Sequence, residues 1–169
     1  MKPFLFRFLL TICCVFTFMN SAYAQAVAGT VKTLLGSAYV QRGSERVTVT
    51  KEMPLYSKDV IVTGSSAFVG IVLSDGTKIT AGANASLNLA NYEFNNDTKK
   101  GAMNVNVTKG VIQVASGVLG KTSRENVQFN TPVATIGIRG TNFVIDVGSD
   151  EEEDKESSKD TKLDSLEKK

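Results

Sequence analysis

The residues that could support catalysis are few in this chain. The sequence contains no histidine, which removes the usual general base near neutral pH, the usual activator of a nucleophile and the commonest metal ligand. Hydrolysis of a glycosidic bond would need two carboxylates flanking that bond. A sheet could pair Asp59 with Asp75, or Asp75 with Asp97, but all three lie in or beside predicted turns. We therefore expect a protein that is not an enzyme and that carries no cofactor or metal.

A relaxed phosphate-loop pattern occurs at residues 115–122, Ala-Ser-Gly-Val-Leu-Gly-Lys-Thr. A phosphate loop needs a helix that begins at its Lys-Thr, because the backbone N–H groups of that helix hold the phosphates. Strand-like residues 127–129 follow instead, after a short polar segment. We interpret the pattern as a glycine-rich turn.

The most distinctive stretch is residues 131–143, Thr-Pro-Val-Ala-Thr-Ile-Gly-Ile-Arg-Gly-Thr-Asn-Phe. Pro132 fixes its own φ and favours an extended conformation at Thr131. Arg139 is the single charge of the stretch and is followed by Gly140 and Thr141. A cation among apolar strand residues needs an anionic or carbonyl partner, so one interpretation makes Arg139 an internal brace of the closing strand. The other makes residues 139–141 a contact with a partner.

The N-terminal residues predict export. A short basic segment, an apolar run over residues 8–19 and a small-x-small pattern before Gln25 are typical of a signal peptide, here residues 1–24. The alternative, a retained membrane anchor, would need about 20 apolar residues. Both cysteines, Cys13 and Cys14, lie in the signal, so we expect no disulfide and no cysteine metal ligand in the mature chain. The expected location is the periplasm, or alternatively the medium or the cell surface, with no membrane span after cleavage.

Charge divides the remainder into a body and a tail. Residues 25–148 carry 12 Lys or Arg against 8 Asp or Glu, and residues 149–169 carry 5 against 9. The cations of the body are scattered along the chain, which argues against a nucleic-acid partner. The tail has too few apolar residues to offset its ordering entropy, so we expect a disordered acidic tail that is simply solvated. The alternative is an acidic arm that binds calcium, a basic partner or the body itself.

The body is predicted to be one all-β domain of short strands. Runs rich in β-branched residues alternate with glycine turns, and no long stretch has helical periodicity. Asp75-Gly76 predicts a hairpin with a type I′ turn, and Lys109-Gly110 predicts a further turn. Ile136, Ile138 and Phe143 are expected in the core. A β-sandwich or roll is the predicted architecture, with a compact β-solenoid as the alternative. The predicted strands are Val27–Thr33, Ala38–Arg42, Val47–Thr50, Val60–Thr63, Ala67–Leu73, Lys78–Thr80, Ser86–Phe94, Asn104–Thr108, Val111–Ala115, Val127–Asn130, Thr135–Ile138 and Phe143–Val147.

The order of these short motifs resembles the FecR-type periplasmic domain. Such domains open with Gly-Val and a strand ending in Arg, continue through an Asp before a Thr turn and a strand–Asp-Gly–strand hairpin, and close on Thr-Pro and Arg-Gly-Thr. The matching positions are Gly29 to Val31 and Gly36 to Arg42, then Asp59 to Thr63, then Ala67 to Gly76 with Asp75 in the turn, and finally Thr131, Pro132 and Arg139 to Thr141.

The resemblance implies function by contact rather than by reaction. In the family's sensor-regulators the domain receives a signal from an outer-membrane receptor and passes it inward to a sigma factor. Here only a signal peptide is predicted before the domain, so we expect a stand-alone exported module. The first hypothesis is a protein-binding module in envelope signalling, which adds a partner strand to an open sheet edge. The alternative is an envelope component that scaffolds or binds glycan or polymer. Either way, the ligand is not specified by the motifs.

Overall fold

The computed structural model describes residues 26–138 and 142–148, and they form an almost entirely β domain. The predicted signal peptide and acidic tail lie outside the described residues. Twelve strands join one sheet, and two short helical turns lie between β9 and β10. The elements are β1 (Val27–Leu35), β2 (Ala38–Arg42), β3 (Glu45–Thr48), β4 (Pro54–Tyr56), β5 (Val60–Thr63), β6 (Phe68–Leu73), β7 (Lys78–Ala81), β8 (Ser86–Phe94), β9 (Gly101–Ala115), α2 (Leu119–Thr122), η1 (Arg124–Asn126), β10 (Val127–Asn130), β11 (Thr135–Gly137) and β12 (Asn142–Val147).

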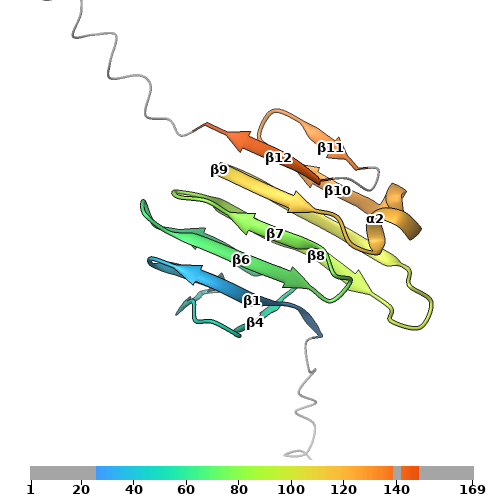
Figure 1. Cartoon of the computed structure of the whole chain (residues 1–169), viewed down its shortest axis with the longest axis horizontal. Coiled ribbons are helices and arrows are strands. Elements are labelled where there is room, and N and C mark those ends of the chain that lie inside the picture. Colours follow the sequence, from blue (N-terminus) through green and yellow to red (C-terminus); the bar gives the residue numbers. More distant parts are fainter. Residues whose placement is uncertain (1–25, 139–141, 149–169) are drawn as a thin grey trace, which may run out of the picture.

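The sheet folds over on itself at β9. Residues 101–109 of β9 pair with β8 and, in parallel, with β10, whereas residues 110–115 lie between β7 and β12. The strands therefore form a front layer (β4, β1, β6, β7, residues 110–115 and β12) and a back layer (β3, β2, β5, β8, residues 101–109, β10 and β11). Figure 1 shows β12, β9, β7, β6 and β1 side by side in the front layer.

This architecture is the predicted roll. The pairing between described strands is antiparallel everywhere except between β9 and β10. A solenoid of stacked turns would need parallel pairing between equivalent strands, so the alternative prediction is wrong.

Gly110 allows one strand to serve both layers. Its φ is +83°, and a Cβ at this position would lie 2.6 Å from the Cα of Ala85. Only glycine tolerates both the left-handed backbone and this close approach. The predicted turn at Lys109-Gly110 is therefore wrong, because the glycine lies inside the 15-residue strand β9 where the strand changes partners.

The core lies between the layers and is filled by alternating side chains of both. Ile138 is buried there, and Ile136 and Phe143 pack against it, as predicted. The ring of Phe143 meets that of Phe129 edge-on, with centroids 5.1 Å apart. The largest fully buried side chains are Phe129, Leu55, Ile61, Ile71, Ile79, Leu87, Leu89, Met103, Ile112, Leu119, Val31 and Val40.

The predicted hairpin at Asp75-Gly76 is confirmed, with a different turn. Gly76 has a φ of +83°, but Asp75 does not have a positive φ. Gly76 N donates to Leu73 O (2.9 Å), and Leu73 N donates to Thr77 O (2.8 Å). This is a three-residue loop in which a left-handed glycine follows the turn, and it needs positive φ at one position only.

Candidate functional site

Arg42 and Asp59, two residues on which the family resemblance depends, form an ion pair. Arg42 Nε donates to Asp59 Oδ1 (2.9 Å) and Nη2 donates to Oδ2 (2.8 Å), while Asp59 is only 1% exposed. The backbone N–H of Tyr56 also donates to Asp59 Oδ2 (2.9 Å), and the guanidinium lies 4.4 Å from the centre of the Tyr56 ring. The hydrogen bond to Asp59 raises the pKa of Arg42 above its usual value. The pair links β2 to the β4–β5 connection, and its carboxylate is fully engaged.

Asp75 forms the centre of a second buried network. Its carboxylate is covered, with the whole residue 3% exposed, and accepts from Thr77 Oγ1 (2.7 Å), Thr77 N (3.2 Å), Tyr92 Oη (3.2 Å) and Leu119 N (3.2 Å). The Tyr92 hydroxyl also accepts from Asp75 N (2.8 Å). Burial, followed by the negative charge of Asp75, raises the pKa of Tyr92 far above its usual value. Asp75 is therefore more than a turn residue, because it joins the β6–β7 turn to β8 and to the start of α2.

This network also explains residues 115–122, which resemble a phosphate loop. Gly117 N donates to Thr77 Oγ1 (3.0 Å), Val118 N to Asp75 O (2.9 Å) and Leu119 N to the Asp75 carboxylate. These three consecutive N–H groups are the kind that a phosphate loop directs at its ligand. Here the β6–β7 turn engages all three. The segment does contain the short helix α2, which the sequence did not predict.

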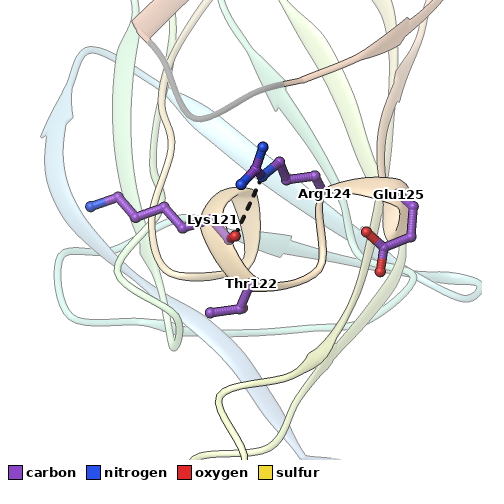
Figure 2. A pocket seen from close by; sticks show the side chains of 4 residues that line it. All are labelled: Lys121, Thr122, Arg124 and Glu125. Atoms are coloured by element: carbon purple, nitrogen blue, oxygen red, sulfur yellow. Dashed lines mark hydrogen bonds between the residues drawn. The ribbon is translucent and has the colours of Figure 1, made fainter.

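A surface depression lies beside the two helical turns, and Figure 2 shows the four side chains that line it: Lys121, Thr122, Arg124 and Glu125. Lys121 and Glu125 point away from each other, and Arg124 Nε donates to the carbonyl of Lys121 (3.4 Å). Thr122 Oγ1 donates to Lys99 O (2.6 Å). These groups do not converge on a common point. In the described part of the chain, no three acidic, histidine or cysteine side chains gather as a metal site would require.

The remaining predicted residues hold turns or lie outside the described chain. Thr63 Oγ1 donates to Gly82 O (2.6 Å) and accepts from Ala85 N (2.8 Å), which holds the β7–β8 connection against β5. Thr131 N donates to Ala134 O (2.8 Å), so Thr131 and Pro132 form the β10–β11 turn. Arg139, Gly140 and Thr141 lie in the undescribed gap, and both interpretations of Arg139 stay predictions. The signature residues that the structure describes thus stabilise separate connections and do not gather at one site.

The sheet edges differ in how well they are protected against pairing with another chain. Proteins guard edges with short strands, charges or proline. β3 carries Glu45 and Arg46, β4 has three residues beginning with Pro54, and β11 has three residues ending in Gly137. β12 has six residues with one charge, Asp146, and among the described strands it pairs only with β9. The edge of β12 is therefore the least protected, a feature that only the sheet order reveals.

The side chains of β12 alternate between buried and exposed, as expected of an edge strand with one face on the core. Ile145 is buried and Phe143 and Val147 are half-buried, whereas Val144 is 60% exposed. The inner residues anchor the strand on the core, and no described strand pairs with the N–H and C=O groups of its second edge. The arrangement can accept an additional strand through main-chain hydrogen bonds.

Comparison with known proteins gives one family match. The FecR family model, described as "FecR protein", matches residues 59–160. A solved structure described as "Cell surface anchoring domain" is 26% identical, with a TM-score of 0.35, and the alignment covers 36% of this chain and 82% of that chain. No curated protein matches the chain. Over the residues described, no helix has the length and apolarity needed to cross a bilayer.

Proposed function

Because the chain belongs to the FecR family, and because no described strand pairs with the second edge of β12, we propose that it is a non-enzymatic module that binds a protein partner by strand addition. FecR domains are associated with the cell envelope, so the chain is an envelope-related module. We place it in the periplasm, in a signalling contact. Its partner is an envelope protein that offers an extended segment to β12.

The observation that carries this proposal is the contrast between β12 and the other three edges. An added strand gains affinity from main-chain hydrogen bonds, which any extended segment supplies, and specificity from alternate side chains. On β12 the exposed side chains available to a partner are Asn142, Val144 and Asp146. Val144 supplies an apolar contact, and Asp146 favours a partner with a cation at the facing position.

The proposal is tested by placing a lysine on the edge. Lysine on an edge strand opposes pairing with another chain, so Val144→Lys should abolish capture of envelope proteins by the purified protein. The matched control is Val133→Lys in the β10–β11 turn, where the side chain is 93% exposed and does not belong to β12. Equal capture by wild type and both variants would refute strand addition at β12. Retention of sugars on a glycan array, with no protein captured, would refute protein binding as the function.

A further inference from the structure

Six amide side chains lie in two rows across the outer surface of the back layer. In the first row Asn88 pairs with Asn106, and Asn106 with Asn130; in the second, Asn91 pairs with Asn104, and Asn104 with Gln128. Their strand neighbours Leu87, Val105, Val107, Val127 and Phe129 are buried, so the amides face away from the core. We call Asn88, Asn91, Asn104, Asn106, Gln128 and Asn130 the amide strip.

The hydrogen bonds within the amide strip leave donors unused. Asn130 Nδ2 donates to the Oδ1 atoms of both Asn104 and Asn106, each at 2.9 Å, and Thr135 Oγ1 donates to Asn130 Oδ1 (2.9 Å). The Nδ2 groups of Asn104 and Asn106 donate no hydrogen bond to any described residue. Asn88 Oδ1 is buried and, among the same residues, has no donor. Such a buried oxygen costs about 1–3 kcal/mol, and because it is covered, the groups left for a ligand are the Nδ2 donors of Asn104 and Asn106.

The composition of the strip narrows the class of ligand. The strip contains no ionisable side chain, although 21% of the chain's residues are charged. A nucleic acid or an anionic lipid surface is bound chiefly by clustered Lys and Arg. A protein partner is bound chiefly by buried aromatic and Arg anchors. Amides supply neutral donors and acceptors side by side, which are the groups that hydroxyls pair with.

We propose that the amide strip binds an uncharged, hydroxyl-rich polysaccharide of the cell envelope. The strands present an amide about every 4.8 Å across the sheet, so an extended sugar chain meets the same pair of donor and acceptor repeatedly. The strip lies in the back layer and β12 in the front layer, so this proposal is independent of strand addition. Together the two surfaces would hold a protein partner against an envelope glycan.

The test is affinity electrophoresis of the full protein in gels that contain one neutral polysaccharide each: a glucan, a mannan or a galactan. We expect at least one of the three polysaccharides to retard the wild type, and the one that does so identifies the kind of glycan that the strip binds. Asn106→Asp keeps the acceptor for Asn130 and removes the free N–H donors, and Gln128→Glu adds a charge at an exposed position. Each variant should weaken binding about tenfold or more, the effect of losing one to two hydrogen bonds.

Gln113→Glu is the matched control, because Gln113 is an exposed strand residue on the front layer. It should bind as the wild type does. Failure of all three polysaccharides to retard the wild type would overturn the proposal. So would unchanged binding by Asn106→Asp and Gln128→Glu, or an equal loss in Gln113→Glu. Val144→Lys should leave the retardation unchanged, so the outcome of this test does not depend on whether β12 binds a partner strand.

Discussion

Asp75→Asn is expected to destabilise the domain strongly, although it changes one atom. Each carboxylate oxygen of Asp75 accepts two hydrogen bonds: Oδ1 from Thr77 N and Tyr92 Oη, Oδ2 from Thr77 Oγ1 and Leu119 N. Whichever oxygen becomes NH₂, two bonds to a charged acceptor are lost and a donor faces a donor. At about 1.5 kcal/mol for each bond, the free energy of unfolding falls by about 3 kcal/mol. For a domain of this size, that lowers Tm by about 10 °C.

Calorimetry of the wild type and Asp75→Asn measures this loss. The matched control is Asp97→Asn, because Asp97 is exposed in the β8–β9 connection, and its free energy of unfolding should stay within about 0.5 kcal/mol of wild type. Hydrogen exchange adds a local readout, since the N–H groups of residues 117–119 depend on the β6–β7 turn and should exchange faster in Asp75→Asn. A Tm for Asp75→Asn within about 2 °C of wild type would refute the reasoning, because it would mean that the network contributes little.

Three further predictions concern stability. Arg42→Lys loses the bidentate hydrogen bonds to Asp59, so the free energy of unfolding measured in urea should fall by about 1–2 kcal/mol. The control Arg46→Lys should not show this fall, and equal urea midpoints for the two variants would contradict a stabilising ion pair. The pKa of Tyr92 is raised on folding, which means that the folded state favours the protonated phenol. This contribution to the stability of the fold is complete below the unfolded pKa of about 10 and is lost as the pH rises above it. As the pH rises through that alkaline range, the free energy of unfolding of Tyr92→Phe, measured in urea, should therefore fall less than that of the wild type. An equal fall in the two proteins would contradict a raised pKa of Tyr92. Gly110→Ala should lower the free energy of unfolding by about 3 kcal/mol, because it strains the backbone and clashes with Ala85. The control Gly148→Ala meets no described neighbour and should unfold like the wild type. Similar stability of the two variants would contradict the described conformation of β9 at Gly110.

The strands and the family could be predicted from the sequence because both depend on local patterns. β-branched runs between glycine turns predicted eleven of the observed strand positions, with β9 divided into two segments. β4 was missed, because Pro54-Leu-Tyr56 is too short and begins with a proline. The ordered motifs led to the FecR family, which the family match confirms.

What could not be predicted depends on contacts between distant residues. Lys109-Gly110 between two strand-like runs has the same local pattern as a hairpin turn, and only the pairing with β8 before Gly110 and with β7 and β12 after it shows that one strand passes through both layers. Arg42 and Asp59 were each recognised but not paired, since 17 positions separate them. Asp75 was assigned to a turn, and its partners Tyr92 and Leu119 come from β8 and α2. The amide strip had a local signal, the alternation of Asn104 and Asn106 with buried valines, but its rows require the strand register.

Hydrogen exchange of the protein, alone and with its captured partner, tests the proposed function most directly. Strand addition predicts that backbone N–H groups within residues 142–147 become protected in the complex, while those of the edge strands β3 and β4 do not change. Protection confined to another surface, with β12 exchanging as it does in the free protein, would contradict docking at this edge.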